Sequence, residues 1–226
     1  MAIGLIPLAS GLTGLVFGFL LFRRAAARGG AHHVVWGIGM LLYAVGGLCE
    51  AATTALGWEG WVFRVWYITG AVLSAAWLGQ GTVYLLVKRS WVHALTAALA
   101  AASVYAAIRV ATATLDSSLA IGELTGKAIV TPGVRTLTPF FNVYGTLALV
   151  GGAIASAVMF LRKKVLGHRV VGNVLIAVGA LMPAVGGSMS RLGVRGLLYV
   201  FELVGIALMF VGFLRATLSS GPARER

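Results

Sequence analysis

The chain has 226 residues, of which 59% are hydrophobic and only 11% charged. This composition excludes a soluble globular domain, so we predict an integral membrane protein. The formal net charge of +12 does not indicate a nucleic-acid partner, because the basic residues cluster at the ends of apolar runs and no nucleic-acid-binding motif accompanies them. The single cysteine, Cys49, excludes an intrachain disulfide and a thiolate metal cluster.

Seven apolar runs reach the length of about 20 residues that a transmembrane helix needs. They span residues 3–22, 34–55, 62–87, 91–111, 137–161, 170–190 and 196–216. The first run lacks the basic start and the small-residue cleavage site of a secretory signal, so we expect it to be retained. The predicted fold is all-α, with one seven-helix transmembrane domain over residues 1–218 and a short cytoplasmic tail over residues 219–226.

Lysine and arginine are distributed unevenly between the two ends of these runs. Twelve lie on one side, namely Arg23, Arg24, Arg28, Lys88, Arg89, Arg162, Lys163, Lys164, Arg169, Arg215, Arg224 and Arg226. Six lie on the other side, namely Arg64, Arg109, Lys127, Arg135, Arg191 and Arg195. Because cytoplasmic loops carry the excess of basic residues, we predict that the N-terminus is outside and the C-terminus is in the cytoplasm.

The third run is the most polar, since residues 63–89 include Arg64, Gln80 and Thr82. On a helical wheel of about 100° per residue, one stripe holds Trp66, Gly70, Leu73, Trp77, Gln80 and Tyr84, and the opposite side holds Arg64, Ala71, Ala75 and Thr82. Polar groups that face hydrocarbon cost several kcal/mol unless they find a partner. We therefore predict that this helix lies at the centre of the bundle.

An internal repeat is suggested by residues 42–51 and 175–184, which agree at six of ten positions. Each segment follows a basic loop and a histidine, His33 or His168. The spacing suggests parallel repeats of helices one to three and five to seven, with the fourth helix as a linker. The alternative is coincidence, because Ala-Val-Gly strings recur in membrane helices.

Two local features bear on packing and on the outer surface. Small residues at a spacing of four, Gly14 with Gly18 and Gly152 with Ser156, predict close helix packing, with oligomerisation as the minor alternative. The only long connection, residues 112–136, joins the fourth and fifth helices outside the cell. We expect an exposed connector there, with a small lid as the alternative.

Ionisable groups inside membrane helices mark functional sites by default. Five such groups fall in the outer third of the bilayer, and neighbouring aromatic and amide side chains complete a predicted outward-facing polar pocket. Its members are Glu50, Arg64, Trp66, Tyr67, Trp77, Arg109, Asn142, Arg191, Tyr199 and Glu202.

Two interpretations of these charges compete. The carboxylates can pair with the arginines and hold the helix ends together, since neither charge is stable alone in hydrocarbon. Alternatively, the surplus of arginines leaves guanidinium donors free for an anionic ligand. A third interpretation, proton transfer through Glu50 or Glu202, is weaker because the inner half contains no carboxylate.

Sequence motifs give no sign of catalysis. No HExxH, GxSxG or P-loop pattern occurs, and no paired histidines lie inside the membrane, so we expect no enzyme, no metal and no cofactor. Pro183 in the sixth run removes a backbone hydrogen bond and predicts a kink, with a hinge as the alternative.

The last two helices resemble those of microbial rhodopsins. The resemblance rests on Gly172-Asn-Val-Leu to Met182-Pro183 and on Leu197-Leu-Tyr to Glu202 and Arg215, and Arg64 matches an arginine near the outer end of the family's third helix. It implies a seven-helix fold with an outside N-terminus. However, the family's retinal-binding lysine is replaced by Ile206, and Tyr67 stands near the place of the third-helix acid, so covalent retinal binding is not expected.

Two other groups of proteins share parts of the pattern. The third helix resembles that of uncharacterised bacterial seven-helix membrane proteins with FR-x-WY, GA and WLG-x-GT-x-YLL. A sugar-transporter family with 3+1+3 parallel repeats shares the architecture, but its Pro-Gln pair is absent, because Ala184 follows Pro183.

The function predicted from the sequence is non-enzymatic binding of a small anionic or amphipathic ligand, as a sensor or a carrier. The alternative is an accessory subunit of a membrane complex, in which the charges are structural. Expected partners are membrane lipids, a small molecule, a protein at the basic cytoplasmic loops and a further copy of the chain. The expected location is a bacterial inner membrane.

Overall fold

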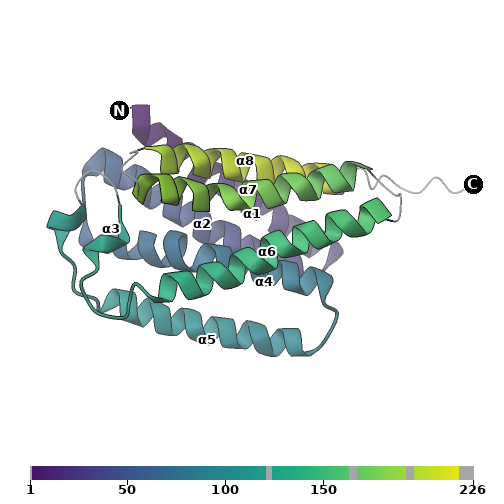
Figure 1. Ribbon diagram of the computed structural model, residues 1–226, viewed down its shortest axis with the longest axis horizontal. Helices are drawn as coiled ribbons and strands as arrows, with labels where there is room; N and C mark the ends of the chain where they lie inside the picture. The colour runs from purple at the N-terminus through teal and green to yellow at the C-terminus, as the bar shows by residue number, and fades with distance from the viewer. Residues whose placement is uncertain (1, 121–123, 163–166, 192–195, 219–226) are drawn as a thin grey trace, which may run out of the picture. The chain divides into compact units, whose positions relative to one another are not determined.

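The fold was analysed in a computed structural model, which describes residues 2–120, 124–162, 167–191 and 196–218 (Figure 1). The regular secondary structure of these residues is helical, apart from an isolated antiparallel bridge between Leu115 and Ile129. Seven helical segments within the described ranges are long and apolar enough to cross a membrane. The predicted all-α class and the seven spans are thus confirmed, and they fit a multi-pass membrane protein.

The helix bounds follow the predicted runs closely. The first two spans are α1 (Ala2–Arg28) and α2 (Ala31–Leu56). The third span consists of three consecutive segments, α3 (Gly60–Trp66), η1 (Tyr67–Leu73) and α4 (Ser74–Leu86). The last four spans are α5 (Trp91–Ala111), α6 (Leu137–Arg162), α7 (Gly167–Arg191) and α8 (Leu197–Leu218). Two short 3₁₀ turns, η2 (Ser117–Ala120) and η3 (Gly126–Ala128), lie between α5 and α6.

The chain divides into two compact units, Met1–Ala148 and Leu149–Arg226. The first unit contains α1 to α5 and the first part of α6, and the second contains the rest of α6, α7 and α8. A single domain over residues 1–218 stays a prediction.

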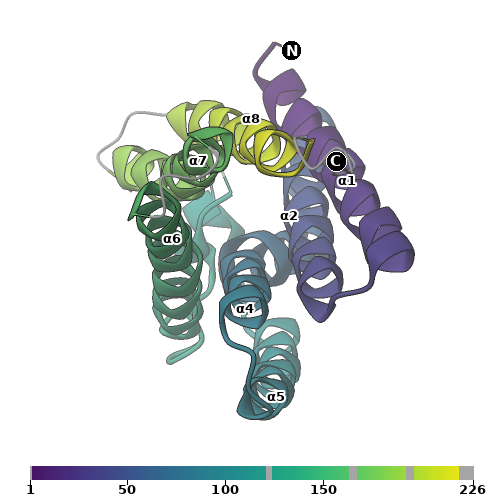
Figure 2. The same cartoon turned by 90° about the vertical axis from the view of Figure 1, so that its right-hand side faces the viewer.

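In the first unit, α2 lies between α1 and α4 (Figure 2). Glycines set these distances, because a Cβ atom at Gly47 would lie 3.1 Å from the Pro7 carbonyl oxygen of α1, and one at Gly46 would lie 2.8 Å from the Gly70 Cα atom of η1. The segment Gly60–Leu86 is the most buried of the seven spans, with 56% of its apolar window buried. This burial agrees with the central place predicted for the third helix.

The third span is not a regular α-helix, which corrects the helical wheel used above. Residues Tyr67–Leu73 form a π-helix, in which hydrogen bonds reach back five residues instead of four. Because each such ring holds one extra residue, the rotation of about 100° per residue does not hold across this segment. Trp66 therefore faces α2, whereas Gln80 bonds with α5 and α6.

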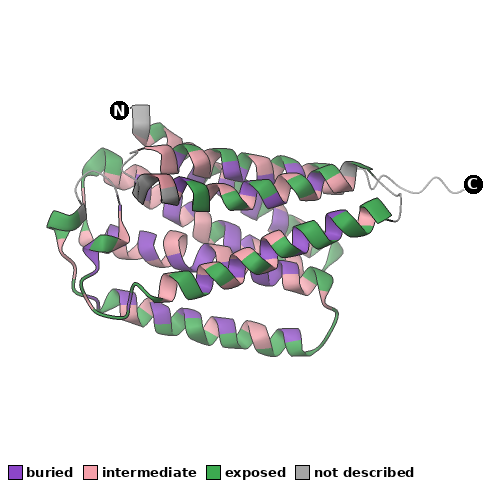
Figure 3. Cartoon of the chain, in the orientation of Figure 1, coloured by how far each residue is buried: buried purple, intermediate pink, exposed green. Residues whose placement is uncertain are grey.

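Exposed positions in the first unit suit a hydrocarbon surrounding. Along α1 they are large apolar residues at helical spacing, namely Leu5, Leu8, Leu12, Val16 and Phe19. Helix α5 is mostly exposed, with a narrow buried stripe formed by Val92, Leu99, Ser103, Ala106 and Val110 (Figure 3). The helices thus present apolar side chains outward, as membrane-spanning segments do.

In the second unit, α7 and α8 form a closely packed pair with reciprocal glycine contacts. A Cβ atom at Gly172 would lie 2.7 Å from the Gly212 carbonyl oxygen, and one at Gly212 would lie 2.6 Å from the Gly172 carbonyl oxygen. In the same way, a Cβ atom at Gly179 would lie 2.5 Å from the Gly205 carbonyl oxygen, and one at Gly205 would lie 2.7 Å from the Gly179 carbonyl oxygen. Pro183 has no N–H for the Gly179 carbonyl, four residues earlier, and that carbonyl faces the Gly205 backbone. Only glycines fit at this distance.

Candidate functional site

Among the described residues of the first unit, the most buried acid is Glu50, near the end of α2 that the predicted orientation places outside. Its side chain is 3% exposed, and its Oε1 atom accepts a hydrogen bond of 2.7 Å from the indole Nε1–H of Trp66 in α3. Bonds to charged groups are stronger than neutral ones, and an acid in a membrane helix requires such partners. The structure therefore brings together two of the predicted site residues.

Aromatic rings surround this bond. Phe63 and Tyr67 stack with ring centres 5.9 Å apart, Trp66 lies 5.6 Å from Phe63, and Trp58 lies 6.1 Å from Phe63. We call Trp58, Phe63, Trp66 and Tyr67 the outer aromatic cluster, after the orientation predicted from the sequence. The buried indole nitrogen of Trp58 has no hydrogen-bond partner among the described residues.

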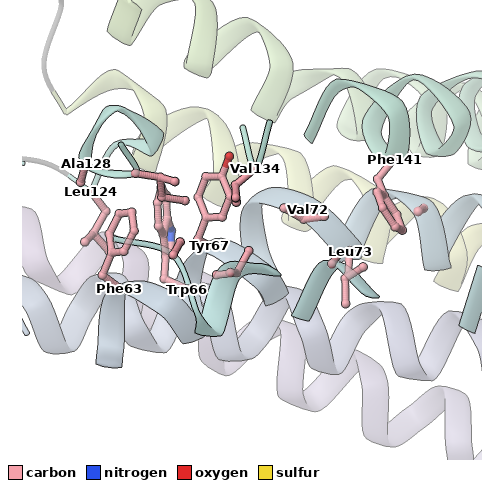
Figure 4. Packing of buried hydrophobic residues seen from close by; sticks show 14 of the residues in the cluster. Phe63, Trp66, Tyr67, Val72, Leu73, Leu124, Ala128, Val134 and Phe141 are labelled. Atoms are coloured by element: carbon pink, nitrogen blue, oxygen red, sulfur yellow. The ribbon is translucent and has the colours of Figure 1, made fainter. Parts of the chain in front are cut away.

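The long connection between α5 and α6 packs onto this cluster. Leu124, Ala128 and Val134 are buried beside its rings (Figure 4). Backbone hydrogen bonds, from Asp116 N–H to Ala128 O at 2.9 Å and from Val130 N–H to Thr114 O at 3.1 Å, join the two sides of the connection. Residues 112–120 and 124–136 thus form a structured cover over the cluster, with buried side chains that the expected exposed connector would lack. Residues 121–123 lie outside the described part of the chain.

Arg64 binds backbone carbonyls at the same end of the first unit. It donates to Ala111 O at 3.1 Å, to Ala113 O at 2.8 Å and to Gly60 O at 3.3 Å. The guanidinium thereby satisfies carbonyls at the C-terminus of α5, where a cation is also favoured by the helix dipole. In the described part of the chain, its hydrogen bonds go to the backbone and not to a carboxylate.

Arg109 has a similar role in α5. It donates to the Tyr105 hydroxyl at 2.8 Å and to Pro132 O at 3.3 Å, and its guanidinium lies 5.8 Å from the Tyr105 ring centre. The bond to Pro132 ties α5 to the cover.

Tyr67 and Asn142 both connect the third span with α6. The Tyr67 hydroxyl lies 2.7 Å from the Thr138 hydroxyl, and the Asn142 amide donates to Ala71 O at 2.9 Å. The Asn142 amide therefore bonds to the π-helical backbone.

A buried polar network lies farther along the third span. Gln80, which is fully buried, donates to the Thr96 hydroxyl at 2.6 Å and to Val92 O at 3.3 Å, and it accepts a bond from the Tyr144 hydroxyl. Trp77 donates to the Ser103 hydroxyl at 3.2 Å. Tyr144 and Thr96 were not among the site residues predicted from the sequence. The useful signal was Gln80 itself, because a buried amide needs partners on facing helices.

The remaining predicted residues belong to the second unit. Tyr199 is buried, Glu202 is half-buried in α8, and Pro183 lies within α7. Arg191 ends α7, but its side chain lies outside the described residues. A pocket shared by all ten residues therefore stays a prediction.

Features typical of cofactor sites are scarce. The described residues contain no group of three His, Cys, Asp or Glu that could hold a metal ion. A surface hollow of about 260 Å³ is lined by Pro139, Phe140 and Val143 of α6, none of which was a predicted site residue.

At the end of the third span that is farther from Glu50, the His93 ring and the Tyr84 hydroxyl share a hydrogen bond of 2.9 Å.

Comparisons with protein-family models, with curated proteins and with solved structures gave no match to this chain.

Proposed function

We propose that this protein is a non-enzymatic membrane protein that binds a small molecule at the outer end of its first unit, as a sensor or a carrier. The observation that carries the proposal is the buried Glu50 carboxylate, bonded to the Trp66 indole inside a membrane-spanning helix. Such a group costs stability and is a functional site by default. The structured cover over the outer aromatic cluster supports a site that is closed from the outside.

The chemistry around this end favours a ligand with an apolar part and a polar group that can accept a hydrogen bond. The outer aromatic cluster offers ring faces and the Trp58 indole N–H. Basic and acidic residues are equal in number at this end of the sequence, with Arg64, Arg109, Lys127 and Arg135 against Glu50, Glu59, Asp116 and Glu123. Ligand entry requires the cover to move, because Tyr67 contacts Gly126 of η3, where an added Cβ atom would lie 2.9 Å from its ring.

The orientation belongs to this proposal. Twelve basic residues at one end of the spans against six at the other support an outside N-terminus and a cytoplasmic C-terminus. We infer a bacterial inner membrane as the location, in agreement with the resemblance to bacterial seven-helix proteins. Anionic lipids, or a protein, would bind at the basic cytoplasmic ends.

A 3+1+3 repeat is also part of the proposal. Gly39 and Gly46 of α2 stand at the positions that correspond to Gly172 and Gly179 of α7 in the repeat alignment. Each pair packs against the helix that follows it. In α2, a Cβ atom at Gly39 would clash with Leu78 of the third span, and one at Gly46 would clash with Gly70. In α7, a Cβ atom at Gly172 would clash with Gly212 of α8, and one at Gly179 would clash with Gly205. The resemblance to microbial rhodopsins is proposed for the architecture alone. The buried Ile206, which is 2% exposed, stands where those proteins carry the retinal-binding lysine.

A thermal-shift screen of purified protein tests the function. Medium-chain carboxylates, phospholipids, sugars and polyenes would be compared on the wild type, on Glu50→Gln and on Glu59→Gln. Glu50→Gln removes the charge but keeps an oxygen for the Trp66 N–H, and Glu59→Gln removes a charge from an exposed residue at the same end. We expect a compound that stabilises the wild type and Glu59→Gln but not Glu50→Gln. A panel without any stabilising compound, or equal shifts in all three proteins, would contradict the proposal.

The second candidate function is an accessory subunit of a membrane complex. It is favoured by the bonding of Arg64, whose donors hold three backbone carbonyls. In that case Arg64→Gln lowers the melting temperature of the protein, no panel compound binds, and the protein co-purifies from its membrane in a stoichiometric complex.

A further inference from the structure

Arg169, near the start of α7, carries a charge that no acid of its own unit balances. Its side chain is half-buried, and its Nε atom is buried without a hydrogen-bond partner among the described residues. Residues 149–218 include a single acid, Glu202. The start of α7 packs on the end of α8, where Gly172 meets Gly212, and Glu202 lies about 15 Å of helix away from that contact. A partly desolvated cation without a counter-ion costs free energy, which a bound anion would relieve.

Phe160 of α6 fixes the orientation of this guanidinium. The Arg169 Cζ atom lies 5.6 Å from the centre of the Phe160 ring, which is a cation–π contact. Such a contact uses one face of the planar group and leaves the N–H donors at its edge for other partners. The backbone is held as well, because the Asn173 amide donates to the Arg169 carbonyl oxygen at 3.0 Å. The side chain is therefore placed before an anion binds, which lowers the ordering cost of binding.

Further cations lie at the same end of the second unit. Arg162 ends α6, and Arg215 lies in the last turn of α8. Arg215 is next to Ala216, whose backbone nitrogen would lie 3.0 Å from a Cβ atom at Gly172. Both arginine side chains are exposed. One fixed guanidinium with exposed cations near it suits an anion that has several acceptor oxygens, as a phosphate group does.

The position of Arg169 along the chain favours the phosphate of a lipid. The apolar run of α7 begins directly after it, at Val170, so the guanidinium lies where hydrocarbon gives way to headgroups. In the predicted orientation this end faces the cytoplasmic leaflet, which carries the anionic lipids, and basic pockets between membrane helices on that side bind lipid headgroups.

We propose that Arg169, held against Phe160, binds the phosphate group of an anionic phospholipid at the α6–α7 end of the second unit. Free phosphate is the other source of the same chemistry. The proposal makes one part of the proposed function specific, namely the binding of anionic lipid at a basic end. It does not depend on the ligand site at Glu50.

The test is native mass spectrometry of the full-length protein in lipid-free detergent. The probes are phosphatidylglycerol, oleate, which is an anionic lipid without phosphate, and inorganic phosphate. We expect phosphatidylglycerol to bind the wild type more tightly than oleate does. Arg169→Gln should weaken this binding about tenfold, as the loss of a hydrogen bond between charged groups does. Arg169→Lys keeps the charge but not the planar fork, so its affinity should lie between those two proteins.

The matched control is Arg162→Gln, which removes the same charge from an exposed arginine at the same end. It should weaken binding by about twofold or less, because exposed ion pairs contribute little. Equal losses in Arg162→Gln and Arg169→Gln would indicate diffuse attraction and overturn the proposal. Wild-type affinity in folded Arg169→Gln, or equal binding of oleate, would overturn it as well.

Two further outcomes separate the possible sources and errors. Inorganic phosphate that binds in place of the lipid, with the same loss in Arg169→Gln, would overturn the lipid as the source. If Arg169→Gln does not fold, Phe160→Leu replaces it, since loss of the ring should weaken lipid binding, and wild-type affinity there would overturn the proposal. Glu50→Gln should bind phosphatidylglycerol as the wild type does, so failure here is distinct from failure of the proposed function.

Discussion

Helices α5 and α8 are attached to their neighbours in different ways. Helix α5 is linked to α4 by side-chain hydrogen bonds, from Gln80 to Thr96 and from Trp77 to Ser103. Helix α8 meets α7 through glycines whose backbones touch. Glycine contacts fix a distance, and they fail if any side chain is added. Hydrogen bonds fix the rotation of a helix, and they can be exchanged for others when that rotation changes.

This difference indicates where movement is least costly. The α7–α8 pair has no space for repacking at Gly179 and Gly205. The third span contains a π-helix, and it meets α2 and α6 through close glycine contacts as well, Gly46 with Gly70 and Gly79 with Gly145, whereas its side-chain bonds to α5 come from Trp77 and Gln80. We therefore expect repacking to be least costly where the third span meets α5.

The largest expected effect is that of Gly205→Leu in α8. The new side chain would meet the Gly179 carbonyl oxygen, because even a Cβ atom would lie 2.7 Å from it. We expect a loss of about 3 kcal/mol in the free energy of unfolding, as for severe overpacking. Gly187→Leu is the control, since nothing lies within 4 Å of its added Cβ atom. Denaturation in mixed micelles measures both, and equal stability of the two variants would show that the glycine contacts are not tight.

The next effect is that of Gln80→Leu, which removes the centre of the network. The Tyr144 and Thr96 hydroxyls lose their partner, and we expect a loss of about 1–2 kcal/mol in the free energy of unfolding. A double-mutant cycle with Tyr144→Phe isolates the Gln80–Tyr144 bond. Additive losses in the double variant would mean that this bond contributes nothing.

A smaller effect is expected for Trp77→Phe. It removes a single bond of 3.2 Å to Ser103, which itself keeps a bond to Leu99 O at 2.7 Å. We expect a loss of about 0.5–1 kcal/mol in the same denaturation measurement. A loss as large as that of Gln80→Leu would show that Trp77 carries packing that the network account does not include.

The smallest expected effect on stability concerns two basic residues that follow the third span. Lys88→Gln with Arg89→Gln should leave the melting temperature in neutral lipid unchanged, because both side chains are exposed. The extra stabilisation by anionic vesicles should fall, at about 1 kcal/mol of lipid interaction per charge. Melting temperatures in neutral and anionic nanodiscs measure this difference. An unchanged preference for anionic lipid would place the lipid contacts on other residues.

The sequence predicted the helices because spans of about 20 apolar residues are a direct consequence of membrane thickness. The α5 bounds, Trp91–Ala111, coincide with the predicted run. The sequence did not predict η1, because the helical wheel assumes a constant rotation of about 100° per residue, which a π-helix does not keep. It selected Glu50 and Trp66 individually, but their pairing depends on the rotation that η1 imposes. Arg64 was selected for its charge, whereas its three carbonyl partners come from tertiary structure.

The central claim is that the Glu50–Trp66 pair belongs to a ligand site. The most direct measurement is a titration of ¹⁵N-tryptophan-labelled protein with the compound that gives the largest thermal shift, followed at the Trp66 and Trp77 indole resonances. We predict a saturable shift of the Trp66 resonance that is absent in Glu50→Gln, with a smaller change at Trp77. Saturable binding that leaves Trp66 unchanged would contradict the account and place the ligand elsewhere.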